Sequence, residues 1–175
     1  MDVAMTGVIE INKTSEMDFN LEVEINRNIE DVWQVLGNEF GEIATWVSLA
    51  KSSEIGGSSK LAEVDYGYRL LKTDKGTAKH VLTSFDSSNH SLSYDVPEGT
   101  PAFVKTATAS WSLTDLGENK TRMNVHFAIQ LGGLLGFLLA PVAKKKLGTL
   151  SDNILEEFKY YMENGKPHPR KIATL

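Results

Sequence analysis

Two histidines at strand-like positions are the side chains best suited to acid–base chemistry in this sequence. Free histidine side chains titrate near neutral pH, so His80 or His126 could donate or accept a hydrogen bond or act as a general base. The alternative for both is a histidine whose hydrogen bonds are satisfied within or on a sheet. Around His126 the alternation places Met123, Val125, Phe127 and Ile129 on one apolar face and leaves His126 on the opposite face.

Two basic residues lie close to apolar strand faces and could recognise an anion. Lys105 shares a face with Phe103, Ala107, Ala109 and Trp111. A lysine there could anchor a carboxylate or phenolate, but its stem more often crosses the surface and places its amine in water. Arg69 lies opposite Tyr66, Tyr68 and Leu70, where it could bind an anionic head group or form a surface salt bridge.

Four aromatic residues are candidates for the wall of a pocket. Tyr68, Tyr94, Trp46 and Trp111 each combine a large apolar area with one polar atom, which suits a ligand of mixed polarity. The alternative is an ordinary core position, and for Trp33 we expect the core.

Sequence signatures of the common catalytic and metal sites do not occur. The chain has no cysteine, which excludes disulfides, thiolate chemistry and cysteine-ligated zinc. It contains no HExxH, no GxSxG and no Walker lysine, and its four histidines show no metal-ligand spacing. We therefore name no catalytic residue, no metal ligand and no cofactor.

Composition indicates one globular domain that does not bind nucleic acid. The chain has 175 residues, 41% hydrophobic and 23% charged, enough to bury a core. A net charge of −5 disfavours phosphate-rich partners. The first residues lack the basic start and apolar run of a secretory signal, so we expect a cytoplasmic protein.

Periodicity predicts the elements that position these residues. Residues 17–25 alternate as a half-exposed strand, and Asn28 caps a first short helix that ends at Gly37. Asn38 begins a second short helix to about residue 45. Turn-punctuated strands follow at 47–55, 62–72, 77–85, 90–96, 103–114 and 120–130, and their short turns predict an antiparallel meander.

A long amphipathic helix is predicted over residues 141–164. Leu147, Leu150, Ile154, Phe158 and Tyr161 recur at spacings of three and four, and Pro141 suits the first turn. The domain therefore spans residues 17–164, between a loose N-terminal segment (1–16) and a C-terminal tail (165–175).

The apolar segment before this helix allows two interpretations. Residues 132–146 are rich in leucine and glycine and end in Lys144-Lys145-Lys146. They could form a flexible lid, or a lip that contacts anionic lipid and gives peripheral membrane contact. The alternative is a buried loop and helix start.

The order of these segments, a strand, two short helices, six strands and a long helix, resembles the helix-grip fold. Residues 31–40 (DVWQVLGNEF) with Trp46 look like the helix pair of the SRPBCC superfamily, in its START-like and polyketide cyclase/dehydrase branch. Residues 66–69 (YGYR), Phe85-Asp86 and residues 92–94 (LSY) look like its strands. Residues 155–163 (LEEFKYYME) resemble its closing helix. The resemblance covers about residues 17–164.

This resemblance implies an α+β fold in which a curved seven-stranded antiparallel sheet wraps around a long C-terminal helix. An apolar cavity is then expected between the sheet and the helix. It implies binding or carriage of a small hydrophobic ligand such as a lipid, polyketide or quinone. The alternatives are a cyclase/dehydrase-type enzyme and a peripheral membrane lipid or quinone chaperone. Residues 73–76 and 96–101 do not match the gating loops of related plant hormone receptors.

The resemblance also implies which residues line the cavity. It places His80 where relatives carry a pocket-facing acid, and it points His126 inward, against the alternation described above. The expected ligand-binding residues are Trp46, Leu49, Tyr68, Arg69, His80, Leu82, Tyr94, Lys105, Trp111, His126, Leu150 and Ile154.

Overall fold

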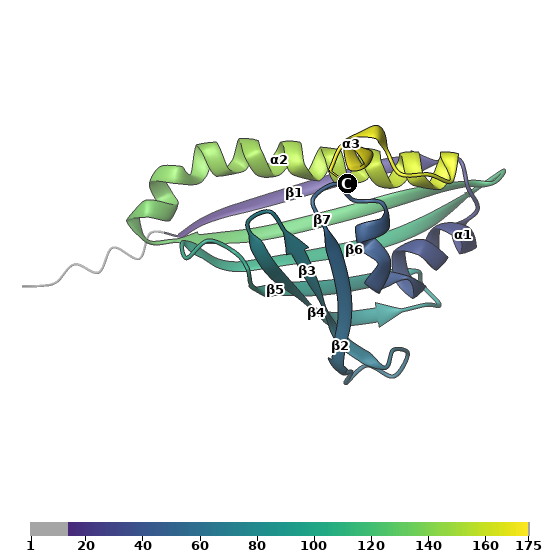
Figure 1. Ribbon diagram of the computed structural model, residues 1–175, viewed down its shortest axis with the longest axis horizontal. Coiled ribbons are helices and arrows are strands. Elements are labelled where there is room, and N and C mark those ends of the chain that lie inside the picture. The colour runs from purple at the N-terminus through teal and green to yellow at the C-terminus, as the bar shows by residue number, and fades with distance from the viewer. Residues whose placement is uncertain (1–13, 175) are drawn as a thin grey trace, which may run out of the picture.

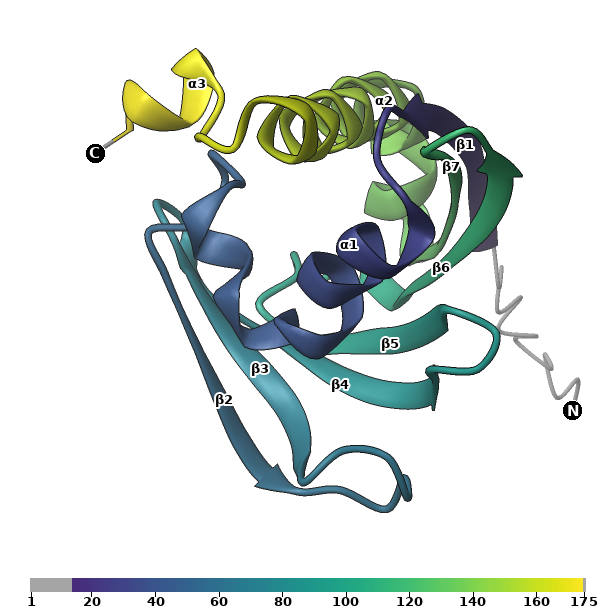
Figure 2. The same ribbon diagram turned by 90° about the vertical axis from the view of Figure 1, so that its right-hand side faces the viewer.

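Seven antiparallel strands form one curved sheet in the order β1-β7-β6-β5-β4-β3-β2, and a long helix lies along its concave side (Figures 1 and 2). The computed structural model describes residues 14–174. This is the predicted α+β architecture. The strands are β1 (Thr14–Ile25), β2 (Ser52–Ser58), β3 (Tyr66–Thr73), β4 (Gly76–Asp86), β5 (Ser91–Glu98), β6 (Val104–Gly117) and β7 (Lys120–Gly132).

The burial pattern of β1 confirms the alternation predicted from its sequence. Met17 and Ile25 are buried, whereas the even-numbered residues from Glu16 to Glu24 are exposed. The strand pairs antiparallel with β7 along its whole length. It begins at Thr14, so residues 14–16 belong to the sheet and not to a loose segment, while residues 1–13 lie outside the described part of the chain.

Two strands begin later than their apolar pattern predicts. We expected strands from residues 47 and 62, but β2 begins at Ser52 and β3 at Tyr66. Val47 and Ala50 are buried in the connecting loop. Their hydrophobicity therefore reflects packing of the loop under the C-terminal part of the chain, which strand periodicity cannot distinguish from sheet burial.

The two predicted short helical segments are observed and are separated at Glu39, whose backbone is not helical. The helix α1 (Ile29–Trp33) is capped by Asn28, whose side chain accepts a hydrogen bond from the Asp31 N–H, as expected. A π-helical turn η1 (Gln34–Asn38) and a 3-10 helix η2 (Phe40–Thr45) follow. The first segment ends at Asn38, one residue after the predicted end at Gly37. A Cβ at Gly37 would lie 2.6 Å from the Trp33 ring, so the glycine is required by packing.

The long helix α2 (Gly133–Asn164) begins before Pro141, so the predicted start is wrong. Pro141 lies inside the helix, although proline usually breaks a helix interior. Gly133 has φ = 72°, a conformation natural to glycine, where the chain turns from β7 into the helix. Residues 133–146, which we interpreted as a lid, as a lipid-contacting lip or as a buried loop and helix start, form the first part of α2.

Aromatic contacts fix the short helices and α2 onto the sheet. Trp33 packs on Phe85 of β4, with ring centroids 5.2 Å apart. Trp46, directly after η2, meets Phe158 of α2 edge to face at 4.9 Å. All four rings are buried, so the core runs continuously from the helical segment through the sheet to α2.

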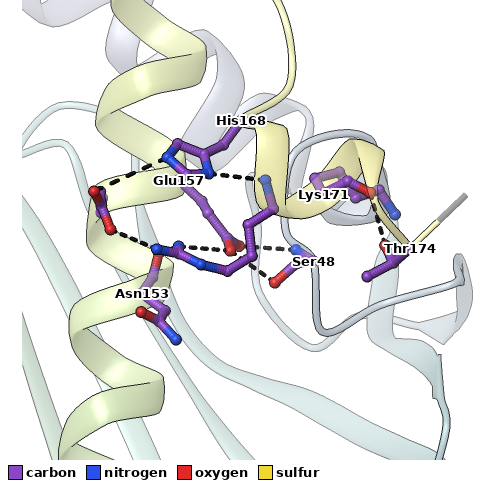
Figure 3. A network of polar contacts seen from close by, with 8 residues as sticks. Ser48, Asn153, Glu157, His168, Lys171 and Thr174 are labelled. Carbon is purple, nitrogen blue, oxygen red and sulfur yellow. Dashed lines mark hydrogen bonds and ion pairs between the residues drawn. The ribbon is translucent and has the colours of Figure 1, made fainter.

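The predicted C-terminal tail folds back as helix α3 (Pro169–Ile172) against α2. Figure 3 shows the polar network that holds it. Glu157 of α2 is fully buried and accepts hydrogen bonds from Ser48 and from Arg170. The Lys171 ammonium donates to the Ala50 carbonyl at 2.7 Å. We call these residues the C-terminal clasp, because they join α3, α2 and the loop before β2.

Within residues 14–174, no helix is long and apolar enough to span a bilayer.

Candidate functional site

A buried arginine, a histidine and a tyrosine from three adjacent strands form the centre of the candidate site. Arg69 of β3 is 4% exposed. Its Nε donates to His80 Nδ1 at 3.1 Å, and its Nη1 donates to the Phe40 carbonyl at 2.8 Å. The guanidinium lies 3.9 Å above the Phe40 ring. The His80 ring stacks on Tyr94 of β5, with centroids 4.6 Å apart.

The environment of Arg69 is unusual for a buried charge. None of the ion pairs formed within residues 14–174 includes Arg69. Burial lowers the pKa of Arg69 to about 10, although Tyr94 and Tyr66 act in the opposite direction. Buried charges in proteins are normally paired with an opposite charge. Arg69 therefore retains the capacity to bind an anion or another strong acceptor.

His80 is held as a neutral imidazole by the same environment. Burial lowers the pKa of His80 well below 6.5, and the positive charge of Arg69 lowers it further. Because Nδ1 accepts the hydrogen bond from Arg69, the ring proton is on Nε2. The side chain can therefore donate a hydrogen bond from Nε2.

A small cavity of about 10 Å3 lies beside this cluster. Its lining includes Arg69, Tyr94, Trp111 and Trp46, with Glu39 and Phe40 from the helical segment. The Trp111 Nε1 donor is buried and has no hydrogen-bond partner within the described residues. Such orphaned donors are rare in native proteins, because each loses its hydrogen bond to water without replacement. An acceptor that reached Trp111 Nε1 would therefore meet a donor that the described residues leave unused.

The concave face beyond this cavity is apolar and only partly buried. Tyr94, Ala109 and Phe127 lie side by side across β5, β6 and β7. The next row along β6 and β7 pairs Ala107 with Ile129. Three side chains on the helix side of the sheet remain partly exposed: Ala107, Phe127 and Ile129. Leu150 and Ile154 on α2 are also partly exposed. Two alanines in the middle of a sheet leave room that larger side chains would fill.

The structure brings five of the predicted site residues together and places three more nearby. Arg69, His80, Tyr94, Trp46 and Trp111 form or adjoin the cluster. Leu82, directly opposite Tyr94 on β4, is a core residue, Ile154 of α2 packs against the same core, and Leu150 of α2 is half-buried.

Four predicted residues lie away from the cluster. His126 is exposed, and its Nε2 lies 2.9 Å from Asp18 Oδ1. The alternation of the strand therefore predicted the orientation of His126 correctly, and the resemblance did not. The Tyr68 ring covers Gly56 and Gly57 and lies 4.5 Å from the Lys79 ammonium, on the face opposite Arg69. Lys105 is exposed, with its stem across Gly132, and Leu49 is 38% exposed.

The surface salt bridge that was one of two alternatives for Arg69 is absent from the described residues, and the contact of Arg69 with His80 was not predicted. The predicted turn at residues 73–76 contained the necessary signal. Because Thr73 pairs with Gly76, a regular hairpin places Arg69 directly opposite His80, as observed. The Phe40 carbonyl and Glu39 were missed, since their positions depend on how η1 and η2 pack onto the sheet.

Metal coordination receives no support from the side chains described. Within residues 14–174, no three His, Asp or Glu side chains converge to hold an ion. The interior donors are nitrogen–hydrogen groups, which suit an oxygen acceptor on an organic ligand.

Solved structures share this fold at low sequence identity. A START superfamily protein from Mycobacterium smegmatis matches with a TM-score of 0.67 and 13% identity, covering 83% of this chain and 96% of that chain. A protein from Nitrosospira multiformis gives 0.68 and 16%, covering 85% and 98%. Norcoclaurine synthase from Thalictrum flavum, as a point mutant in complex with a transition-state analogue, gives 0.60 and 13%, covering 83% and 96%.

Sequence comparison gives the family directly. No curated protein matches the chain significantly. The family model described as "Polyketide cyclase / dehydrase and lipid transport" matches residues 16–163. This range includes all seven strands and α2, apart from the first two residues of β1 and the last residue of α2. Family and fold together suggest ligand binding. The chain therefore belongs to the polyketide cyclase/dehydrase and lipid transport family and has the helix-grip fold of the START-like proteins.

Proposed function

We propose that this protein binds and carries a small apolar molecule that has a carbonyl, carboxylate or phenolate head group. The observation that supports this proposal is Arg69, a buried guanidinium that lacks a carboxylate partner among the described residues. The head group would accept hydrogen bonds from Arg69, and Trp111, whose Nε1 has no partner among the described residues, lines the same cavity. Lipids, polyketides and quinones all carry such oxygen acceptors.

The apolar part of the ligand would lie along the concave face. Phe127, Ile129 and Ala107 are partly exposed there, as are Leu150 and Ile154 on α2. Covering them with hydrocarbon would gain about 25 cal/mol for each Å2 of apolar surface removed from water. The cavity beside Arg69 holds only about 10 Å3, so the head group must enter by moving neighbouring side chains.

A cyclase or dehydratase activity is the second candidate, and the pairing of His80 with Tyr94 favours it. A neutral imidazole stacked on a phenol could move a proton at a ligand carbon beside a carbonyl. The norcoclaurine synthase of similar structure is an enzyme. Incubation of an extracted ligand or a polyketide substrate with the protein, followed by mass spectrometry, separates carriage from turnover.

The first experiment is native mass spectrometry of the protein purified from its own host, with solvent extraction of the bound material. A retained lipid, polyketide or quinone supports the proposal. A protein that is empty and also fails to bind anilinonaphthalene sulfonate, an apolar anionic dye, contradicts it.

Arg69→Gln provides the test of the head-group contact, because glutamine retains a donor for the Phe40 carbonyl. Charge-assisted hydrogen bonds contribute about 1.5–3 kcal/mol, so we expect the variant to bind the dye at least about tenfold more weakly. The matched control is His126→Gln, which changes an exposed side chain on the opposite face. If dye binding weakened equally in both variants, or did not weaken in Arg69→Gln, Arg69 would not be part of the binding site.

A further inference from the structure

The first turns of α2 carry an apolar stripe on the side that faces solvent. Leu134, Leu135, Leu138 and Val142 are 69%, 58%, 63% and 55% exposed. Their spacing of one, four and eight residues places them on one side of the helix within about 12 Å of its length. Gly136, which is buried, marks the opposite side, where the helix meets Leu131 and Phe103.

This stripe is unusual for a helix that packs on a sheet. A surface helix normally turns its apolar side to the core and its polar side to water. Further along α2 this rule holds, because Leu155, Phe158 and Met162 are buried while Asp152 and Glu156 are exposed. Contiguous exposed apolar groups on a soluble domain mark an interaction surface.

Three lysines follow the stripe directly. Lys144, Lys145 and Lys146 are all exposed, and a shallow hollow beside them is lined by Pro141, Val142, Lys145, Lys146 and Thr149. The sequence contains no acidic residue between Gly133 and Ser151. In a chain of net charge −5, this end of the helix is therefore a local positive region beside an apolar one.

We propose that residues 133–146 dock the protein onto an anionic lipid bilayer. The leucines would enter the boundary between head groups and acyl chains, and the lysines would contact anionic head groups beside them. The remaining acidic surface would be repelled from the membrane, which orients the molecule with this end toward the lipid. The first turns of α2 are at the far end of the helix from α3, where the helix overhangs the sheet (Figure 1).

Charge distinguishes the bilayer from a second copy as the occupant. A symmetric dimer through this stripe would leave both Lys144–146 clusters beside the contact without an acidic partner from the facing helix, because the chain has no acidic residue between Gly133 and Ser151. An anionic surface instead matches both the apolar stripe and the adjoining lysines. The docking surface does not depend on the identity of the internal ligand.

Vesicle flotation with the full chain tests the proposal. We expect binding to vesicles of phosphatidylcholine with 30% phosphatidylserine, weakening as salt increases, and at least about tenfold weaker binding to pure phosphatidylcholine. Leu134→Ser with Leu138→Ser should abolish binding. The matched control, Ile55→Ser with Leu116→Ser, also removes two exposed apolar side chains but lies elsewhere, and it should bind normally.

A charge-reversal pair tests the lysines separately. Lys145→Glu with Lys146→Glu should weaken binding by about fivefold or more for each residue, since one basic residue near an anionic surface contributes about 1 kcal/mol. Lys60→Glu with Lys75→Glu makes the same change in net charge on exposed loops away from α2 and should have little effect. Equal loss in both pairs would show attraction by overall charge alone and would overturn the docking surface.

A fluorescent label reports insertion directly because the chain has no cysteine of its own. An environment-sensitive dye on Leu135→Cys should shift to the blue with anionic vesicles, whereas the same dye on Ile55→Cys should not. The proposal fails if the full chain does not bind vesicles. It also fails if sedimentation shows a dimer that dissociates in the Leu134/Leu138 variant. Vesicle binding only by a chain that lacks residues 1–13 would contradict it as well, because in each of these two cases the stripe would have another occupant.

Discussion

The carboxylate of Glu157 joins two parts of the chain that are 109 residues apart. One oxygen accepts the Ser48 N–H at 2.8 Å, and the other accepts the Ser48 hydroxyl at 2.7 Å. The second oxygen also accepts from Arg170 Nη1 at 2.9 Å. A fully buried carboxylate is tolerated because its acceptor sites are filled by donors that approach from three directions.

Replacing Glu157 by alanine should be strongly destabilising. The change leaves Ser48 and Arg170 without their acceptor at a buried position, so we expect the free energy of unfolding to fall by about 3 kcal/mol. Glu156→Ala is the matched control, because Glu156 also binds Arg170, at 2.7 Å, but on the surface. An exposed ion pair contributes at most about 1 kcal/mol. Urea unfolding at pH 7 measures both, and equal losses would contradict the role of Glu157.

Stability should depend on pH through His80. The pKa of His80 lies well below 6.5 in the folded protein, because of burial first and the Arg69 charge second. As pH falls below 6.5, the unfolded chain takes up a proton that the folded protein excludes, so stability decreases toward acid pH. The slope contributed by one such group is at most about 1.4 kcal/mol per pH unit.

The variant His80→Asn isolates this effect. Asparagine does not titrate, and its side-chain oxygen can accept the hydrogen bond from Arg69 Nε in place of Nδ1. We expect its stability to decrease less steeply than that of the wild type between pH 6.5 and pH 5, as followed by urea unfolding at several pH values. Parallel pH profiles for the two proteins would show that His80 does not control this slope.

Two glycines should respond to alanine in opposite directions. At Gly37 a Cβ would lie 2.6 Å from the Trp33 ring, so alanine must displace a buried aromatic, and we expect a loss of about 1–3 kcal/mol. At Gly148, inside α2, the Cβ would meet Phe19 at an ordinary 3.6 Å. Alanine there should stabilise by about 0.5–1 kcal/mol, because glycine is a poor helix former. Thermal unfolding of both variants tests the opposite signs.

Periodicity in the sequence predicted the elements whose burial is one-sided. The alternation of β1 and the three-and-four spacing of α2 after Leu147 are both set by one buried face. The start of α2 was missed, because Leu134, Leu135, Leu138 and Val142 face solvent and thus give no amphipathic signal directed to the core. Pro141 reinforced the error, since a helix interior rarely contains proline.

The candidate site could be predicted in part for a related reason. Hairpin register, which follows from a short turn, brings Arg69 opposite His80. The carbonyl of Phe40 reaches Arg69 only through the packing of η2 on the sheet, a contact between segments 29 residues apart. The expectation that His126 faces inward relied on the resemblance, and the local alternation was the better guide to its side chain.

The pairing of β1 with β7 also has a consequence for how the chain folds during synthesis. Strands β2 to β7 can each pair with the strand made just before or after it, whereas β1 must wait for a partner about one hundred residues later. Contacts of such large sequence separation form slowly. We therefore expect β1 to leave the ribosome early and to join the sheet last, with α2 closing over it once β7 is complete.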